Sequence, residues 1–312
     1  RKVICVVGPT ACGKTTLGVL LAQKYGGEVV SADSMQVYRR MDIGTAKPTP
    51  EEMRGIPHHM LDVADPEEDF SVARYVELAA PCVDDILARG KLPIVAGGTG
   101  LYLDSLLSGR TFAPFSPDGG LRARLEARFD ALGGEAMLGE LAAADPEAAA
   151  RLHPNDRKRI VRALEVFQQT GKTISQHNRE TRALPLRYDA LTLSLAFQRR
   201  EDMWARIDRR VDEMMAAGLA EEVRALLDSG VPVRCTAMQA IGYKEMAAAL
   251  RGGGDVCAAA EEIKLRSRQY AKRQLTWFRR TEGAKWLFWG PEPDFEAACR
   301  TSTKYLEEFG LV

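Results

Sequence analysis

The sequence predicts an α/β protein with a parallel β-sheet flanked by helices and one all-helical insertion domain. Two observations support this fold class. Short, continuously apolar segments, typical of strands covered on both faces, alternate with longer segments of helical periodicity. The first apolar segment also runs directly into a glycine-rich loop and a helix, which is the strand–helix alternation of a parallel sheet.

The N-terminal segment supplies the first strand–helix–strand unit. Residues 3–8, VICVVG, form an apolar run that predicts a buried strand. A helix should follow from Lys14 to Tyr25 and end at Gly26-Gly27, because glycine is common just after a helix C-terminus. Residues 28–33, EVVSAD, then predict a second strand that ends on Asp33.

Further strands and helices of the same kind follow. Ser71 is a favourable N-cap for a helix that runs to about Arg89, before Gly90, and the strand LPIVAGG at 92–98 comes next. The remaining expected elements are a strand at 188–197, long helices after it, a late strand at 284–290 and a closing helix at 294–309.

The character of the sequence changes near Thr111. Residues 111–185 have helical periodicity and contain no convincing strand. We therefore expect two domains. An α/β core is formed by residues 1–110 and 186–312, and a helical insertion domain is formed by residues 111–185.

Composition limits the classes of protein to which the chain can belong. A sequence with 46% hydrophobic and 28% charged residues is typical of a globular protein. No apolar run approaches the ~18–20 residues of a membrane span and no signal peptide precedes the first strand, so we expect no membrane association. The six cysteines are scattered without a C-x-x-C pair, which indicates neither a zinc site nor a disulfide framework and favours a reducing cytoplasm.

The loop after the first strand has the spacing of a phosphate-binding P-loop, which predicts a P-loop NTPase-like sheet. Backbone N–H groups and the helix N-terminus bind the anion in such loops, and Lys14 adds a full positive charge. The Thr15 hydroxyl is the candidate ligand for Mg²⁺ bound to the phosphates. The expected phosphate-binding residues are Gly8, Pro9, Thr10, Ala11, Cys12, Gly13, Lys14 and Thr15.

The P-loop does not specify what the phosphates are attached to. A small-molecule kinase, a nucleotide-dependent switch and a transferase that releases pyrophosphate all fit the motif. A kinase or a switch usually has an acidic Mg²⁺ ligand at the end of another strand. No aspartate follows the apolar run at 92–98, although Asp33 could serve, and no clear guanine- or adenine-reading motif is present.

A second polar segment, SADSMQVYRRMDIGTAKP at 31–48, follows the second strand. The carboxyl ends of strands line the binding crevice of an open parallel sheet, so Asp33 should stand beside the bound phosphates. The alternative is that Asp33 only caps the residues that follow it.

Seven segments together resemble the bacterial tRNA dimethylallyltransferases, also called tRNA isopentenyltransferases or the IPP transferase family. They are, in order, GPTACGKT, DSMQVYRRMDIGTAKP, FSVARY, GGTGLY, HPNDRKRIVRALEV, QAIGYKE and YAKRQLTWFRR. The resemblance implies transfer of a dimethylallyl group from dimethylallyl diphosphate to N6 of the adenine immediately 3′ of the anticodon, in tRNAs that read codons beginning with U. It also implies that the P-loop holds the substrate's diphosphate and that no nucleotide is hydrolysed. One departure is Cys12, where the family usually has serine.

The chemistry of this reaction suggests roles for individual side chains. Asp33 would be the general base that accepts the N6 proton, and Thr99 would orient the attacking amine. Lys14 and Mg²⁺ at Thr15 would stabilise the leaving diphosphate. Arg206 and Arg210 lie four residues apart, hence on one helix face, and could clamp the diphosphate from the opposite side. The alternatives are a solvated basic helix face for the arginines and a purely structural turn for GGTG.

The anticodon stem-loop of tRNA is the implied partner, and its flipped base and backbone require planar and cationic groups. The chain has no net charge, but residues 151–182 hold eight basic and three acidic residues, and residues 261–280 hold seven and two. Each run alone is typical of a solvated helix face. The resemblance implies tRNA contacts at Asp33, Ser34, Met35, Gln36, Thr99, Lys158, Arg159, Ile160, Val161, Arg162, Gln239, Ala240, Ile241, Gly242, Tyr243, Lys244, Lys272, Arg273, Gln274, Leu275, Thr276, Trp277, Phe278 and Arg279.

Two other functions remain open at this point. A P-loop kinase acting on a small alcohol or a nucleoside would need a nucleotide site and would transfer a γ-phosphate. A catalytically silent RNA-binding protein could keep the fold, but the presence of Lys14, Thr15, Asp33 and Thr99 argues against it. We infer no protein partner and expect a monomer.

Overall fold

The computed structural model describes residues 1–109, 112 and 119–312, and these fall into two compact units. Unit 1 comprises Arg1–Leu107 and Arg187–Val312, and unit 2 comprises Ser108–Leu186. The sequence analysis placed the boundaries of the insertion at residues 111 and 185. The first of these, residue 111, lies outside the described residues.

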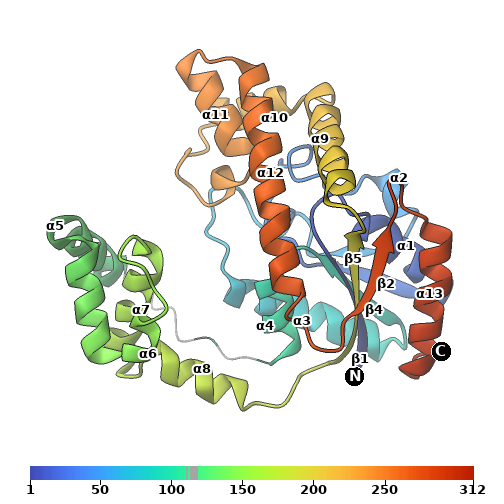
Figure 1. Ribbon diagram of the computed structural model, residues 1–312, viewed down its shortest axis with the longest axis horizontal. Helices are drawn as coiled ribbons and strands as arrows, with labels where there is room; N and C mark the ends of the chain where they lie inside the picture. Colours follow the sequence, from blue (N-terminus) through green and yellow to red (C-terminus); the bar gives the residue numbers. More distant parts are fainter. Residues whose placement is uncertain (110–111, 113–118) are drawn as a thin grey trace. The chain divides into compact units, whose positions relative to one another are not determined.

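Unit 1 is built on a six-stranded parallel sheet in the order β3-β2-β4-β1-β5-β6 (Figure 1). The predicted α/β class is therefore confirmed. The short strand β3 was not predicted, because two residues are too few to show a sequence pattern. The strands are β1 (Lys2–Val7), β2 (Gly27–Ser31), β3 (His58–His59), β4 (Leu92–Gly97), β5 (Asp189–Phe197) and β6 (Lys285–Trp289).

Helices cover both faces of this sheet, and β1 shows the alternation that requires it. Ile4 and Val6 pack into the cluster that contains residues of α1 and α13, whereas Val3, Cys5 and Val7 pack into the cluster of α3 and α4. The covering helices are α1 (Lys14–Tyr25), α3 (Val72–Ala88), α4 (Gly100–Leu107) and α13 (Phe295–Glu308).

Local signals set the ends of these elements largely as predicted. Gly26 takes the left-handed conformation (φ 63°) after α1, and the Ser71 hydroxyl accepts a hydrogen bond from the Arg74 N–H at the start of α3. β2 ends at Ser31, two residues earlier than predicted. The chain turns there because the Asp33 carboxylate accepts the N–H group of Met35.

The second half of unit 1 adds a helical layer beyond the sheet. Two ion pairs, Arg268–Asp208 (2.6 Å) and Lys264–Asp212 (2.7 Å), join its two longest helices, α9 and α12. The elements of this part, with a short helix from the loop after β2, are α2 (Pro50–Met53), α9 (Arg200–Ala216), α10 (Leu219–Asp228), the 3₁₀-helix η1 (Ala237–Gln239), α11 (Tyr243–Gly252) and α12 (Val256–Phe278).

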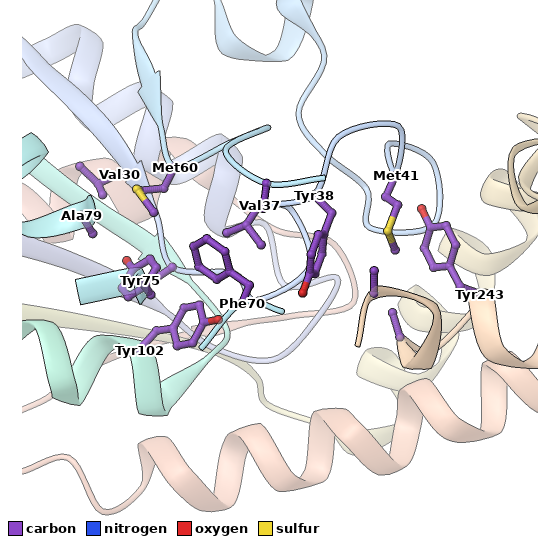
Figure 2. Close-up of a cluster of buried hydrophobic side chains, with 14 of the residues drawn as sticks. Val30, Val37, Tyr38, Met41, Met60, Phe70, Tyr75, Ala79, Tyr102 and Tyr243 are labelled. Carbon is purple, nitrogen blue, oxygen red and sulfur yellow. The ribbon is translucent and has the colours of Figure 1, made fainter. Parts of the chain in front are cut away.

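A row of buried aromatic side chains fixes the loop after β2 between the sheet and α11 (Figure 2). Tyr75 and Tyr102 stack with ring centroids 4.1 Å apart, and Phe70 contacts Tyr38 edge to face. Tyr243 of α11 lies at the far end of the row. The loop is thus part of the core and can hold the residues after Asp33 in fixed positions.

Within the described residues of unit 2, the regular elements are all helices, joined by turns. The helix α5 (Gly119–Ala144) is broken at Gly133, which has a non-helical φ of 81° and ψ of 165°. Residues on both sides of the break pack against α7 (Arg157–Thr170) in a separate hydrophobic cluster. The other helices are α6 (Pro146–Ala149) and α8 (Ile174–Arg182).

Two remaining expectations concern membranes and cysteines. In the part of the chain that the structure describes, no helix combines the length and the apolar character needed to cross a membrane. All six cysteines are free, and Cys5 and Cys12 are buried.

Candidate active site at the carboxyl edge of the sheet

The predicted catalytic residues meet because three neighbouring strands end at the same edge of the sheet. β1 pairs with β4, where Val7 aligns with Gly97, and β4 pairs with β2. The P-loop follows β1, Asp33 follows β2 and Thr99 follows β4, as the rule for parallel sheets requires. The P-loop and Asp33 border a cavity of about 750 Å³ that is also lined by residues 42–47, 239–242, and parts of α9 and α12. Thr99 is hydrogen-bonded to Ser34, which lines this cavity.

The P-loop is arranged to receive an anion. No side chain caps the start of α1 and no acidic residue lies in its first turn, so the N–H groups there remain available. Gly13 has a φ of 83°, and a Cβ at this position would lie 2.7 Å from the Phe295 ring, so only glycine fits. Lys14 Nζ donates to the carbonyl of Pro9 (2.7 Å), within the loop itself.

Two residues from the end of the chain support the P-loop from behind. Trp289 Nε1 donates to the Cys12 carbonyl (2.9 Å), and the Trp289 ring packs edge to face against Phe295. Burial raises the pKa of the Cys12 thiol, so this departure from the family pattern remains a neutral, packed side chain. No local pattern indicated the role of Trp289, because an indole at a strand end is normally a core residue.

Asp33 uses one carboxylate oxygen to hold its own loop. Oδ1 accepts the N–H groups of Met35 (2.8 Å) and Gln36 (3.3 Å). Through Oδ1, Asp33 therefore does cap the residues that follow it, as the alternative interpretation of the sequence expected. Both of these hydrogen bonds are made by Oδ1 and not by Oδ2.

Thr99 ties two of the strand ends together. Its hydroxyl oxygen accepts the Ser34 N–H (3.1 Å) and lies 3.3 Å from Ser34 Oγ, and its own N–H donates to the Ala32 carbonyl (3.1 Å). The GGTG segment is thus a structural turn that also places Thr99 beside the Asp33 loop.

Arg206 and Arg210 both line the cavity. Burial lowers the pKa of Arg210, and the charges of Asp33 and Cys12 act in the opposite direction. Arg206 pairs with Glu292 (3.3 Å), as does the exposed Arg209. The alternative interpretation, a basic helix face exposed to solvent, applies to Arg209. It does not apply to Arg210, whose half-buried side chain lines the cavity.

The predicted tRNA-contact residues of unit 1 differ in exposure. Gln36 has its amide engaged: Nε2 donates to the carbonyls of Thr45 and Ala46, and Oε1 accepts the Ser31 hydroxyl. Tyr243 is fully buried and donates to Glu222. Their side chains hold the site together in this structure. Ala240, Gly242, Gln274 and Phe278 are also buried, Ser34, Met35, Thr99, Ile241 and Leu275 are half-buried, and Gln239, Lys244, Lys272, Arg273, Thr276, Trp277 and Arg279 are exposed.

The basic run of α12 divides into a paired and an unpaired half. Lys264, Arg266 and Arg268 each pair with an acidic side chain. Within the described residues, no salt bridge is found for Lys272, Arg273, Arg279 or Arg280. The free positive charge therefore gathers at the C-terminal end of α12, beside the exposed Trp277.

In unit 2, most basic residues of the run at 151–182 form salt bridges with acidic residues of the same unit. Arg162 pairs with the buried Glu165 (2.7 Å), and Ile160 and Val161 belong to the hydrophobic core. Lys158 and Arg159 are exposed, and among the described side chains no acidic partner is found for either. The side chain of Arg182 lies outside the described part, and the paired members of the run are Arg151, Arg157, Arg162, Lys172 and Arg179.

Sequence reasoning missed Glu222 of α10. Its carboxylate accepts the N–H groups of Asp42, Ile43 and Gly44 (2.8–3.1 Å) as well as the Tyr243 hydroxyl. It thereby fixes the loop that closes one side of the cavity. A glutamate in the first turn of a helix usually has no such partner, so no local pattern could have identified it.

A phosphate-binding loop, a carboxylate and an arginine around one cavity define a P-loop group-transfer enzyme. The chain belongs to the IPP transferase family, whose model matches residues 36–281, and a second model, isopentenyl transferase, matches residues 1–68. The chain accordingly has a P-loop NTPase-like fold.

Relatives and solved structures agree over nearly the whole chain. The tRNA dimethylallyltransferase of Acetivibrio thermocellus is 44% identical over 99% of each chain, and that of Geobacillus kaustophilus is 47% identical over 98% of this chain and 96% of the relative. The crystal structure of the tRNA isopentenylpyrophosphate transferase from Bacillus halodurans is similar at a TM-score of 0.74, with 41% identity over 98% of this chain and 96% of that one. A eukaryotic dimethylallyltransferase acting on tRNA is similar at a TM-score of 0.82, with 31% identity over 98% of this chain and 78% of that one.

Proposed function

We propose that this chain transfers the dimethylallyl group of dimethylallyl diphosphate to N6 of the adenine immediately 3′ of the anticodon, in tRNAs that read codons beginning with U. The observation that supports this most strongly is the meeting of the P-loop, Asp33 and Arg210 around one cavity, with Thr99 hydrogen-bonded to the Asp33 loop. The family membership and the names of the similar enzymes support the same reaction.

The reaction exchanges one bond for another. The bond between the allylic carbon and the diphosphate oxygen breaks, its electron pair leaves with the diphosphate, and N6 forms a new bond to that carbon. Negative charge grows on the departing oxygen as this happens. Lys14, the free N–H groups at the start of α1 and Arg210 surround the place where that charge develops, so they stabilise it.

The N6 proton is accepted by Asp33. The lone pair of an adenine amine is delocalised into the ring, so attack on carbon leaves a proton that must be removed. Because two N–H groups hold Oδ1, the carboxylate is fixed with Oδ2 as its proton acceptor. Thr99, bound to the Asp33 loop through Ser34, orients the amine with its hydroxyl.

We propose Mg²⁺ as the cofactor, held chiefly by the substrate. Among the described residues, no cluster of three or more His, Cys, Asp or Glu side chains could hold a metal ion. Mg²⁺ usually retains several waters and binds substrate phosphates through few protein ligands, which fits a site with the Thr15 hydroxyl beside the P-loop. When bound, the ion adds positive charge that neutralises the diphosphate.

The anticodon stem-loop binds to the exposed basic groups. Lys272, Arg273 and Arg279 supply cations for the backbone, and Trp277, which is 40% exposed, supplies a surface on which a base can stack. Lys158 and Arg159 of unit 2 supply two further cations. We further expect a monomer that acts in the cytoplasm, because the scattered free cysteines favour a reducing compartment.

Incubation with labelled dimethylallyl diphosphate, Mg²⁺ and bulk tRNA tests the function. After digestion of the tRNA to nucleosides, the label should be found in one modified adenosine, and a Lys14→Ala variant should incorporate far less. A parallel reaction with γ-labelled ATP and nucleosides tests the kinase alternative. Label passing from ATP to a nucleoside, with none passing from the prenyl donor to tRNA, would contradict the proposal.

A further inference from the structure

The helix α12 has two faces with different roles. Lys272, Arg273 and Thr276 are exposed, whereas the Gln274 side chain between them is only 6% exposed. Trp277 Nε1 donates to Asp104 Oδ2 of α4 (3.1 Å), so the end of α12 lies beside α4 (Figure 1). A glutamine buried on the inner face of a basic helix requires polar partners there.

Gln274 finds both partners in the loops of the active site. Its Oε1 accepts the N–H group of Thr10 in the P-loop (2.8 Å), and its Nε2 donates to the carbonyl of Gly98 (3.0 Å). Both partners are backbone groups, so the orientation of the amide is determined by the chemistry of the N–H and C=O that it meets. The side chain is a direct bridge between the ends of β1 and β4.

Gly98 is shaped to receive this bridge. A Cβ at position 98 would lie 2.2 Å from Gln274 Nε2, far inside van der Waals contact. Glycine at this position therefore allows the amide to reach the backbone. The need for glycine at position 98, the second glycine of the GGTG segment, thus comes from the close approach of Gln274 and not from that of a substrate.

The same helix face holds a second contact. Tyr270, one helical turn before Gln274, also lines the cavity and lies near the side chains of Thr99 and Gln274. Hydrogen bonds of Gln274 thus join the P-loop to Gly98, and the next residue, Thr99, is hydrogen-bonded to Ser34 of the Asp33 loop.

We propose that Gln274 is a positioning residue that sets the spacing between the P-loop and the Thr99 loop. This inference rests on the proposed function, in which the first loop holds the leaving diphosphate and the second orients the adenine. Attack requires the reacting atoms about 3–3.5 Å apart, and an error near 1 Å can reduce the rate about 100-fold. A rigid amide between the two loops holds that distance. It also engages the Thr10 N–H, so the N–H groups that bind the diphosphate begin at Ala11.

Two substitutions separate positioning from general packing. Gln274→Met keeps the size of the side chain and removes both hydrogen bonds. Gln274→Glu keeps both only when the carboxyl is protonated, because its O–H then donates to Gly98 while the other oxygen accepts from Thr10. The ionised form repels the Gly98 carbonyl, and burial raises the pKa of such a carboxyl above its usual value of about 4.3.

The measurement is the single-turnover rate of prenyl transfer at saturating substrates, from pH 5.5 to pH 8. We expect Gln274→Met to be about 10- to 100-fold slower than the parent at every pH. The rate of Gln274→Glu relative to the parent should rise as the pH falls. Gln269→Met and Gln269→Glu, the same changes at an exposed position of α12, should follow the parent. Melting temperatures and diphosphate affinity by calorimetry show whether each variant is folded.

The outcomes distinguish a failure of the proposed prenyl-transfer function from a failure of the positioning role of Gln274. A parent enzyme that transfers no prenyl group would contradict the proposed function. An active parent together with Gln274→Met at the parent rate would overturn the positioning role. A slow but pH-independent Gln274→Glu would also overturn it, because a carboxyl that restores the bridge must restore the rate.

Discussion

The two carboxylate oxygens of Asp33 make the two interpretations of this residue, a cap and a general base, compatible with one another. Oδ1 closes a turn by accepting two backbone N–H groups, as any capping aspartate does. The same turn fixes the carboxylate next to Thr99 and the P-loop. A cap and a base are therefore compatible in one side chain, and only a substitution that preserves the cap can separate them.

Asp33→Asn is that substitution. The carbonyl oxygen of the new side chain still accepts the Met35 N–H, but the amide cannot accept a proton from N6. A positioned general base contributes ~10²–10⁴-fold, so the single-turnover rate should fall by that factor while diphosphate affinity changes little. Rapid-quench transfer assays and calorimetry with dimethylallyl diphosphate measure the two effects.

Lys14→Ala provides the contrast for Asp33→Asn. It removes a charge from the phosphate site, so it should weaken diphosphate binding as well as slow transfer. If Asp33→Asn transfers the prenyl group at the parent rate, Asp33 is only a cap, and the base is another group.

The positions of the site residues could be predicted from sequence only where backbone spacing determines them. The P-loop, Asp33 and Thr99 follow strands, and the geometry of a parallel sheet places such residues together. The uses of Gln36 and Gln274 could not be predicted, because their partners are backbone groups elsewhere in the fold. Both glutamines lie in family motifs, and motifs do not distinguish a residue that contacts substrate from one that holds the site.

At the scale of elements, a buried glutamate lies where the strands begin, at the end of the sheet away from the active site. It connects residues in or next to three strands and one helix. Glu28 of β2 is only 2% exposed and accepts hydrogen bonds from Arg89 and Lys91, which flank the connection between α3 and β4. It also pairs with His59 of β3 (2.8 Å). Hydrogen bonds from Arg89, followed by those from Lys91 and His59, hold the pKa of Glu28 well below its usual value despite burial.

The direction of these shifts sets a pH dependence of stability. The unfolded chain binds a proton at Glu28 below about pH 4.3, whereas the folded chain resists protonation, so this contribution is present above about pH 4.3 and is lost as the pH falls. The pKa of His59 is raised, first by its hydrogen bond with Cys82 and also by Glu28, against an opposing effect of burial. Its contribution is present below about pH 6.5 and is lost as the pH rises through the folded-state pKa.

Glu28→Gln should therefore lower the free energy of unfolding at pH 7 by about 1.5–3 kcal/mol, the range for hydrogen bonds to a charged group. The difference from the parent should shrink between about pH 4.3 and pH 2.5, where the parent loses the same contribution. Urea unfolding at several pH values measures this. Glu77→Gln, at an exposed position of α3, is the control and should show a small difference that does not depend on pH.

Helix α7 shows why counting charges along the sequence is a poor guide to a binding surface. The run at 151–182 has a large basic excess, but in the folded chain most of those charges pair with acidic residues. Two of these acidic residues, Asp130 of α5 and Glu147 of α6, lie on other helices of unit 2. Periodicity predicted the helices themselves because it is a local property. The ion pairs depend on how the helices pack, which no local pattern specifies.

The unpaired charges of α7 give the next prediction. Phosphate contacts release counterions, with a slope of about −0.7 in log affinity against log salt for each phosphate of a single strand. Lys158→Ala combined with Arg159→Ala should make the slope for tRNA less steep by about 1.4 if each residue contacts one phosphate. Filter binding over a range of salt concentrations measures the slope. Arg300→Ala with Lys304→Ala, the same charge change on α13, should leave it unchanged.

At the scale of the whole molecule, the chain is organised so that unit 2 interrupts unit 1 at one point. The Arg187 N–H donates to the Leu107 carbonyl (2.8 Å), so the two ends of unit 1 that flank the insertion are already joined. Arg187 also pairs with Asp84 of α3 (2.8 Å). The hydrophobic cluster of unit 2 consists of its own residues, among them Leu125, Met137 and Leu164. Each unit thus has a core of its own.

This organisation leads to a prediction for a chain in which a short Gly-Ser linker replaces residues 108–186. Because Leu107 and Arg187 are hydrogen-bonded, the linker closes without strain, and unit 1 should keep a cooperative unfolding transition. All residues proposed to bind diphosphate belong to unit 1, so its affinity should stay within about twofold of the parent, a change of about 0.4 kcal/mol. The affinity for tRNA should fall at least about tenfold, because Lys158 and Arg159 are removed. Calorimetry with dimethylallyl diphosphate and filter binding with tRNA test the two halves separately. Unchanged tRNA affinity would show that unit 2 does not bind tRNA, and loss of diphosphate binding by a folded variant would show that unit 1 does not form the site alone.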